Sequence, residues 1–458
     1  MNKDKTKITD QPQTEQNSGQ QTLFNLSNFG NKKVEVQFTA EQISTDGGLL
    51  FLKEVDENIG LIGRIAACLE DHRHQSYVIH DMKSLLSQRI MQIAAGYEDA
   101  NDCNELRNDG VLKICCEKEN SLSAQPTMSR FENSVSTKEL YKISQVFADQ
   151  FIASYAEQPK VIILDCDDTD AQAYGGQQLT LFNNYYGGYC YMPLHIYEGL
   201  SGKLITSILK PGRRSKSVDV FGILRRLIEY LRKSWPGTLI ILRGDSHFCS
   251  REFMDWAEEE EKIGFVTGLS GNQLLNKKAN VTIESAKRAF KTNGRPVKRY
   301  HSFIYKAGSW EHPQRVVAKV EVNKKGTNVR YIVSNIKCIR TKALYENAYC
   351  ARGAAELRIK DHKTYLKSDR MSCNSFKANQ FRLFLHSAAY VLIHSLQKEA
   401  LAATEYCKST MKTIQLKILK IATRVKILKT KVKIEFPLEF PVRKVFENLL
   451  LMFGILRL

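Results

Sequence analysis

A run of side chains between positions 349 and 363 could bind both a metal ion and phosphate groups. Tyr349, Arg352, Glu356, Lys360 and Lys363 follow one another at spacings of three, four, four and three residues. At about 100° per residue, they all fall within roughly 40° of Glu356 on a helix surface. A carboxylate flanked by cations and a phenol can hold a metal ion at its centre and phosphates at its edges. The alternative is a solvated helix face with an ordinary ion pair between Arg352 and Glu356.

Two further carboxylates follow apolar runs that are typical of buried strands. The run 161–164 leads to Asp167, and the run 238–242 leads to Asp245. We expect these strands to be neighbours in one sheet, with the helix that carries Glu356 packed across them. Asp167, Asp245 and Glu356 would then form an oxygen-lined site suited to Mg²⁺, with Mn²⁺ as a substitute. Two such ions about 4 Å apart can activate a water or hydroxyl and stabilise the leaving oxygen of a phosphodiester displacement.

The first of these carboxylates is not unique, because four aspartates occur within positions 165–170. On a strand, Asp165 and Asp167 share one face, whereas Asp168 points to the other. An aspartate at the end of a strand is also a common turn former or helix cap. The residues alone leave the choice between Asp165 and Asp167 open.

The charge balance indicates a polyanionic partner. The chain has 67 Lys and Arg against 49 Asp and Glu, a net charge of +18, and a pI near 9.3. Nucleic acid is the first candidate and an anionic membrane the second. The most apolar expected helix, 381–396, contains Arg382 and two histidines and is too short for a membrane span. The polar stretch 1–21 predicts no signal peptide, and the eleven cysteines without a C-x2-C pair are typical of reduced thiols in a cytosolic protein.

The local patterns predict where the strands and helices lie. From position 160 the order is strand, strand, strand, helix, strand, helix, strand, followed later by the Glu356 helix. That order matches a ribonuclease H-like α/β fold, as in retroviral integrase. Strands are expected at 161–164, 189–198, 203–209, 238–242, 263–269, 297–305, 315–322 and 329–334. Helices are expected at 218–233, 251–262 and 376–401, and Ser129 with Glu132 predicts a capping box that opens another.

Composition and pattern divide the chain into six segments. The N-terminal helices are expected to contact DNA, with a plain helical packing module as the alternative. The basic C-terminal region alternates Lys or Arg with Ile, Leu and Val over 408–433, which predicts strands. The segments are a disordered tail (1–22), a helical DNA-binding region (23–158), the first part of the core (159–271), a β-rich insertion (272–345), the second part of the core (346–403) and the basic region (404–458).

With these motifs the chain resembles the DDE transposases of bacterial insertion sequences that carry a Y-x2-R-x3-E-x6-K signature. The signature positions are Tyr349, Arg352, Glu356 and Lys363. In the family the first carboxylate lies in a strand-ending Asp-x-Thr, which 167–169 fits, and the second follows an apolar strand, as Asp245 does. The stretches 123–133 and 175–179 are similar to one branch of the family, and the resemblance spans roughly residues 30 to 435.

The resemblance implies movement of a DNA element by cleavage and strand transfer. Metal-bound water would cut at the element end, and the freed 3′-hydroxyl would attack again, closing a hairpin in related enzymes. The resemblance implies that Asp167, Asp245 and Glu356 are the catalytic residues and that they bind two Mg²⁺ ions. It implies that Tyr349, Arg352 and Lys363 bind DNA phosphates. We add Lys360, which lies on the same stripe, to the phosphate-binding residues.

The same resemblance implies the partners and the location. The partners are double-stranded DNA, as terminal inverted repeats and as target, and a second copy of the chain in a synaptic homodimer. The N-terminal helices would recognise the repeats, and the insertion would help to hold the hairpin or the paired ends. No membrane partner is expected, and the location is the bacterial cytoplasm in association with the nucleoid.

Two other functions are compatible with such a chain. One is a DNA-binding protein derived from a transposase that no longer cuts. The complete set of Asp167, Asp245 and Glu356 argues against it. The other is a structure-selective nuclease with the same core, which would need neither the stripe around Glu356 nor the long insertion.

Overall fold

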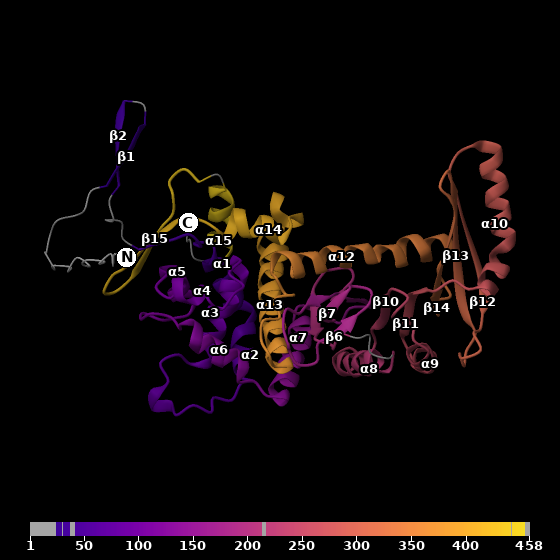
Figure 1. Cartoon of the computed structure of the whole chain (residues 1–458), viewed down its shortest axis with the longest axis horizontal. Helices are drawn as coiled ribbons and strands as arrows, with labels where there is room; N and C mark the ends of the chain where they lie inside the picture. The colour runs from indigo at the N-terminus through magenta and orange to yellow at the C-terminus, as the bar shows by residue number, and fades with distance from the viewer. Residues whose placement is uncertain (1–23, 30, 37–41, 213–216, 441, 454–458) are drawn as a thin grey trace, which may run out of the picture.

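The computed structural model of the chain describes residues 24–29, 31–36, 42–212, 217–440 and 442–453. The predicted disordered tail, 1–22, lies outside the described residues. Figure 1 shows the N-terminal helices and the C-terminal elements at one end of the molecule and α10 (Gln273–Asn293) at the other, with the main sheet between them. Among the described residues, no helix is long and apolar enough to cross a membrane.

A mixed eight-stranded sheet forms the centre of the molecule. β4, β10 and β11 run parallel to one another, and every other neighbouring pair is antiparallel. In spatial order the strands are β12 (Val297–Tyr305), β13 (Gln314–Asn323), β14 (Gly326–Ser334), β11 (Ile263–Leu269), β10 (Leu239–Gly244), β4 (Val161–Asp168), β8 (Leu194–Glu198) and β9 (Leu204–Ile208).

Alternation along the central strands sends consecutive side chains to opposite faces. On one face, Ile162 and Leu164 of β4 and Leu242 of β10 pack against α8 (Ser217–Ser234) and α9 (Arg251–Glu259). The other face is covered by the helical run 341–365 and by α13 (Phe376–Ser395). The odd-numbered residues of β4, which include the two candidate aspartates, therefore face the helix that carries Glu356.

The predicted β-rich insertion is part of the same sheet. β12 has the expected bounds, and β13 and β14 exceed theirs by one to three residues. β14 pairs antiparallel with β11, so these three strands lengthen the central sheet instead of forming a separate layer. The helix α10, which packs on β12 and β13, was missing from the prediction.

A small three-stranded sheet interrupts the core between β4 and β8. It consists of β5 (Ala171–Gln172), β6 (Leu181–Asn183) and β7 (Gly188–Tyr191) in the order β5-β7-β6. The sequence predicted one strand over 189–198, whereas the structure has β7 and β8 separated at Pro193. Proline has no backbone N–H for a ladder hydrogen bond, which accounts for the break.

The N-terminal region is helical, as expected, and packs around α13. Its longest helices are α1 (Leu49–Ile59), α3 (Met82–Ala95) and α7 (Thr137–Ala153). Short strands precede the helices, namely β1 (Phe24–Phe29), β2 (Lys32–Val36) and β3 (Ile43–Ser44).

The predicted capping box was misplaced by one helix. Ser129 and Glu132 lie inside α6 (Gln125–Asn133). The capping box is formed instead by Ser136 and Glu139 at the start of α7, where the Glu139 backbone donates to the Ser136 hydroxyl and the Ser136 backbone donates to the Glu139 carboxylate. Glu132 has a different role, because its buried carboxylate pairs with two buried arginines.

The C-terminal region contains fewer strands than its alternating pattern predicted. It begins with a 3₁₀ turn (Glu405–Lys408), a helical turn, α14 (Met411–Ile414), and a π-helical turn at 415–419. Ile414 and Ile418 are buried at helical spacing. Only then follow β15 (Thr423–Ile427) and β16 (Val432–Glu435), and β15 pairs with β3 near the start of the chain.

Candidate active site

The candidate aspartates meet because β4 and β10 are parallel neighbours. Asp167 is the second-last residue of β4, and Asp245 directly follows β10. A tight turn holds Asp245: its carboxylate accepts the backbone N–H of His247 at 2.8 Å, and its other oxygen lies 2.9 Å from the His247 Nδ1. Asp245 is thus a turn former and a candidate ligand at once. Its position confirms that the two strand ends come together.

The Glu356 helix is not a uniform α-helix. It begins with α11 (Thr341–Ala343) and continues through a π-helical turn (Leu344–Tyr349) and a 3₁₀ turn (Cys350–Arg352) into α12 (Gly353–Lys360). A second π-helical turn, Asp361–Tyr365, follows. Figure 1 shows this run, labelled α12, crossing the molecule from α13 to β13. Such changes in helical pitch concentrate at functional sites, and they alter the angular positions that an ideal helix would give.

Arg352 links the two parts of the site. Its guanidinium donates to Asp167 Oδ2 at 3.1 Å and to Glu356 Oε1 at 3.4 Å. The predicted pair between Arg352 and Glu356 is therefore present, but the same arginine also reaches across to β4. Glu356 stays mostly open to solvent, with 63% of its side chain exposed, whereas Asp167 has 19% exposed.

The other stripe residues spread along the helix and do not all enter the site. A Cβ atom at Gly268 of β11 would lie 2.9 Å from the Tyr349 hydroxyl and 2.9 Å from the Ser246 backbone N, so the missing side chain lets Tyr349 approach the Asp245 turn. Lys363 Nζ lies 2.6 Å from Asp170 Oδ1 and 3.3 Å from Thr169 Oγ1, just beyond the end of β4.

Lys360, which is exposed one turn after Glu356, differs from Lys363. Lys363 is fixed to the end of β4, whereas Lys360 is directed to solvent. Of the phosphate-binding candidates on the stripe, Tyr349, Arg352 and Lys363 approach the ends of the strands, whereas Lys360 does not.

Asp165 lies deeper than Asp167 and has other partners. It is fully buried, and both of its carboxylate oxygens accept hydrogen bonds from Arg243 of β10. Arg358 of α12 lies 3.6 Å from the same carboxylate. Arg243 also donates to the backbone carbonyl of Ala348 at 2.8 Å, which ties the helical run to the sheet. Asp165 is thus buried and bonded to arginine at both oxygens, and through Arg243 it anchors the Glu356 helix.

The sequence reasoning missed Arg243 and Arg358. The available signal was a charged residue within the otherwise apolar strand 239–244, because a buried charge requires a partner. Asp168, on the opposite face of β4, is similarly engaged: its oxygens lie 2.7 and 2.8 Å from Lys210 Nζ. Of the crowded aspartates, Asp167 is the one that faces Asp245 and Glu356.

The local charges affect the two candidate aspartates differently. Burial, together with the neighbouring carboxylates Asp245, Asp168 and Glu356, raises the pKa of Asp167 to about 6 despite the attraction of Arg352. Burial also acts to raise the pKa of Asp245, but the hydrogen bonds from His247 outweigh it and hold that pKa below its usual value. The site therefore has an excess of negative charge that a bound cation would neutralise.

The donor set fits a hard divalent cation, although the three carboxylates are not drawn tightly together. Among the described residues, the group whose possible ligand atoms all lie within 4.8 Å of one another is Glu259, Glu311 and His312, which is largely exposed. Asp167 and Glu356 are instead bridged by the Arg352 guanidinium. Carboxylate oxygens are the ligands that Mg²⁺ and Mn²⁺ prefer, and burial together with the neighbouring carboxylates raises the pKa of Asp167.

A cavity of about 350 Å³ adjoins Asp245 on the side of the insertion. Its wall includes Lys319 of β13 and Arg330 of β14, together with Tyr345 and Tyr349 of the helical run. Lys319 lies over the Tyr345 ring at 5.5 Å. The insertion strands thus place two cations, and the helical run two phenols, next to the candidate active site.

Comparison with known proteins identifies the family. The family described as transposase DDE domain group 1 matches residues 26–456. The chain belongs to this family. The DDE transposase chain is also similar to a solved structure, a cryo-EM structure of the piggyBac transposase synaptic complex with hairpin DNA, at 12% sequence identity and a TM-score of 0.43 over 83% of each chain. No curated protein matches the sequence of this chain.

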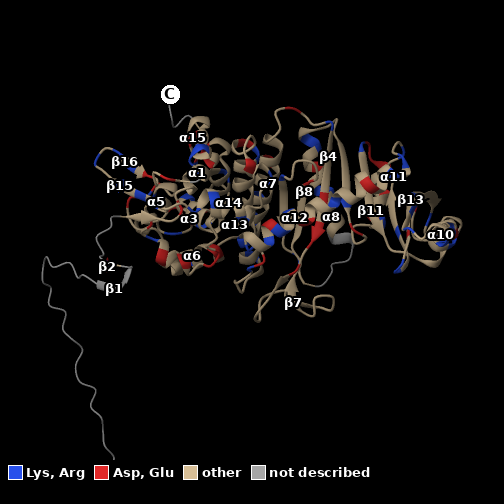
Figure 2. Cartoon of the chain, turned by 90° about the horizontal axis from the view of Figure 1, so that it is seen from above, with Lys and Arg blue, Asp and Glu red and all other residues tan. Residues whose placement is uncertain are grey.

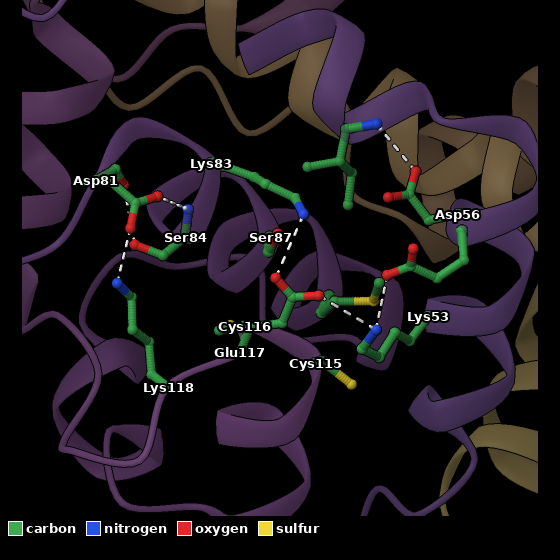
Figure 3. A pocket seen from close by; sticks show the side chains of 13 residues that line it. Lys53, Asp56, Asp81, Lys83, Ser84, Ser87, Cys115, Cys116, Glu117 and Lys118 are labelled. Carbon is green, nitrogen blue, oxygen red and sulfur yellow. Dashed lines mark hydrogen bonds and ion pairs between the residues drawn. The ribbon is translucent and has the colours of Figure 1, made fainter.

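A second cavity of the DDE transposase lies among its N-terminal helices and shows a different charge pattern (Figure 3). Lys53 pairs with Glu57 at 2.7 Å, and both Lys53 and Lys83 approach Glu117. Lys118 pairs with Asp81 at 2.7 Å. The three lining lysines thus have carboxylate partners, so the positive charge of this cavity is compensated.

Proposed function

We propose that this DDE transposase binds the terminal inverted repeats of its insertion sequence and catalyses metal-dependent DNA cleavage and strand transfer. The observation that carries the proposal is the meeting of Asp167 and Asp245 at adjacent strand ends with Arg352 between Asp167 and Glu356. The family membership supports it independently. Double-stranded DNA is the proposed partner, and the net charge of +18 suits it.

We further propose that the core is ribonuclease H-like. The strand order β9-β8-β4-β10-β11 supports this, with two antiparallel strands beside three parallel ones. In such a sheet the polar side chains that follow β4 and β10 are exposed at one edge, where a ligand can reach them. The segment boundaries predicted at 159–271, 272–345 and 346–403 are part of this proposal.

Asp167, Asp245 and Glu356 would hold the Mg²⁺ or Mn²⁺ ions. Such ions, when bound, supply an activated water or hydroxyl and neutralise charge on the scissile phosphate. The protein's own contribution is positioning, which phosphoryl transfer needs more than covalent chemistry. Two rigid strands fix the aspartates, while Glu356, being mostly exposed on a helix, can move toward them when Arg352 releases it.

The phosphate-binding role falls to the cations and phenols around the carboxylates. Arg352 would exchange its carboxylate partners for DNA phosphate once the metals neutralise Asp167 and Glu356, because a guanidinium binds phosphate in the same bidentate way as a carboxylate. Tyr349 and Lys363 flank it on the same side of the helix, and Lys360 would contact DNA further from the scissile bond. The two ends of a DNA element would be held in a homodimer.

The direct test is cleavage of a duplex that carries the terminal repeat flanking the gene, with Mg²⁺ or Mn²⁺. Glu356→Gln should abolish cleavage and leave end binding within about threefold, because the amide keeps the shape but binds a metal poorly. Glu284→Gln, which changes a similarly exposed carboxylate on α10, is the matched control and should cut normally.

The other candidate functions give different results in the same assay. Binding of the repeat without cleavage by the unaltered protein, over several metals, would indicate a DNA-binding protein that has lost catalysis. Cleavage of branched DNA without any need for the repeat would indicate a structure-selective nuclease. Full cleavage by Glu356→Gln would show that the proposed active site is wrong.

A further inference from the structure

The small sheet between β4 and β8, residues 171–192, has an unusual composition and surface. This segment, here called the aromatic sheet, contains no Asp, Glu, Lys or Arg, although 25% of the whole chain is charged. Figure 2 accordingly shows the ribbon around the β7 label without charge colouring. Aromatic rings on it are open to solvent: Tyr174 is 88% exposed, Tyr185 84%, Tyr189 59% and Phe182 51%. Isolated exposed rings are common, but four on one short uncharged segment indicate a binding surface.

The rings are held in place by a well-connected scaffold. Gln177 donates to the backbone carbonyls of Met371 and Cys373, and the Tyr191 hydroxyl donates to the Gln178 carbonyl at 2.6 Å. The Gln177 bonds fasten the base of the aromatic sheet to the loop before α13, and the Tyr191 bond ties the segment together internally. A binding surface that is ordered in advance loses less conformational entropy when its ligand arrives.

The turn that carries Tyr185 is fixed as well. The Asn183 side chain donates to the Gly212 carbonyl at 2.9 Å and accepts the Tyr185 backbone N–H at 3.0 Å. Gly187 closes the turn with a φ of +66°, which a glycine adopts without strain. Tyr185 packs edge-on against Tyr186 with ring centroids 4.9 Å apart, so its own outer face stays free.

The aromatic sheet begins where the candidate active site ends. The chain leaves β4 at Asp168 and enters the aromatic sheet after Asp170, whose carboxylate is held by Lys363 of the Glu356 helix. Tyr186 lies close enough for this charge to act on it: burial and then Asp170 raise the pKa of its hydroxyl to about 12. A nucleotide whose phosphate lay at Asp167 would therefore have its neighbours within reach of this surface.

We propose that the aromatic sheet binds unpaired nucleobases beside the scissile phosphate. Tyr185 is the main ring on which a base stacks, and the pair of Phe182 and Tyr189 is a second stacking position. An uncharged surface cannot attract the phosphate backbone, but every base offers a flat face that stacks on an aromatic ring. Phe182 and Tyr189 form a T-shaped pair at 5.6 Å, which leaves ring surface exposed. The inference rests on the proposed function only in placing the scissile phosphate at Asp167.

The test measures binding to single strands with and without bases. The probe is a fluorescein-labelled oligothymidylate of about 20 nucleotides, compared with an abasic strand of equal length, by fluorescence polarisation in EDTA. The parent should prefer the strand with bases, and Tyr185→Ala should weaken that binding about five- to tenfold without changing the abasic affinity. Tyr185→Phe, which keeps the ring, should bind like the parent. Tyr141→Ala, which removes an exposed tyrosine on α7, is the matched control and should have no effect.

The possible outcomes separate this inference from the proposed function. Two variants are compared with the parent: Tyr185→Ala, and a double variant that combines Phe182→Ala with Tyr189→Ala. If the parent cleaves its repeat but both variants bind both strands as tightly as the parent does, the aromatic sheet is not a base-binding site. An equal loss on both strands would also overturn it, since backbone contacts would then be responsible. If these variants shift the oligomeric state in size-exclusion chromatography and leave base binding intact, the surface is a protein interface instead. Absence of cleavage with base-dependent binding retained would contradict the proposed function alone.

Discussion

Replacing Asp167 by asparagine should make the metal-free protein more stable. The carboxylate of Asp167 has a pKa of about 6 against an ordinary value of 3.8, because it is buried among other carboxylates. That difference corresponds to about 3 kcal/mol by which the ionised group opposes folding at neutral pH. Asparagine has the shape of the protonated acid and carries no charge. For a chain of this length unfolding as one unit, the gain would raise the melting temperature by about 3 °C.

The dependence of this gain on pH follows from the direction of the shift. Above about pH 6 the carboxylate is ionised in both the folded and the unfolded chain, and the full advantage of the Asp167→Asn variant over the parent is present. Between pH 6 and 3.8 the folded protein takes up a proton first, so the advantage shrinks by about 1.4 kcal/mol per pH unit. Below pH 3.8 the parent and Asp167→Asn should be equally stable.

The assay is urea denaturation of both proteins in EDTA at about pH 7.5 and at the lowest pH at which they stay folded, repeated with Mn²⁺ at neutral pH. Mn²⁺ should stabilise the parent and leave Asp167→Asn nearly unchanged, since ligand binding stabilises only the state that binds. Asp165→Asn tests a different effect: burial raises the pKa of Asp165 too, but the substitution leaves Arg243 and Arg358 without their buried carboxylate and should cost about 3–5 kcal/mol. The prediction is refuted if Asp167→Asn is no more stable than the parent at neutral pH, or if its gain in free energy of unfolding does not change with pH.

Two further predictions concern other charged groups. Glu132→Gln should lower the free energy of unfolding, measured by urea denaturation at neutral pH, by about 3–5 kcal/mol. The reason is that Arg89 and Arg382, both almost fully buried, each lie 2.7 Å from the Glu132 carboxylate. A loss below about 1 kcal/mol would show that these arginines find other partners. Lys363→Gln should lower the slope of log Kobs for DNA against log salt concentration by about one, as expected for one lost phosphate contact. Lys360→Gln, on the exposed side of the same helix, should lower it less, and equal slopes for the two variants would contradict the assignment of Lys363 to the site.

The strands and the meeting of Asp167 with Asp245 could be predicted from the sequence because apolar runs of β-branched residues have few other uses. The central strands bury their side chains on both faces, and parallel neighbours bring their ends to one edge. The helix α10 was missed because its face toward β12 and β13 is short of large apolar residues, with Ala279 and Ala286 among its buried positions. At the C-terminus, Ile414 and Ile418 alternate with lysine in a way that suits a strand as well as a helix, and only packing against the N-terminal helices decides between them.

The partners of the charged residues were harder to predict than their positions. The choice between Asp165 and Asp167 depends on Arg243, which lies directly opposite Asp165 in the pairing of β4 with β10. Strand register is not encoded in either strand alone, so neither run could reveal the contact. The contact of Arg352 with Asp167 likewise depends on how the helix crosses the sheet and on its π-helical turns, which no spacing rule gives.

The contrast between Asp165 and Asp167 explains how one strand can both support and perform the proposed chemistry. Burial raises the pKa of Asp165 as well, but both of its oxygens accept hydrogen bonds from Arg243, which fixes the Glu356 helix on the sheet through the Ala348 carbonyl. Asp167, two residues later on the same face, has one arginine that it shares with Glu356, and burial together with three neighbouring carboxylates raises its pKa to about 6. In the proposed mechanism, bound cations would neutralise Asp167 and Glu356 and would free Arg352 for phosphate. If Asp167 holds a metal ion as proposed, Asp167→Asn should both stabilise the metal-free protein and abolish the stabilisation by Mn²⁺.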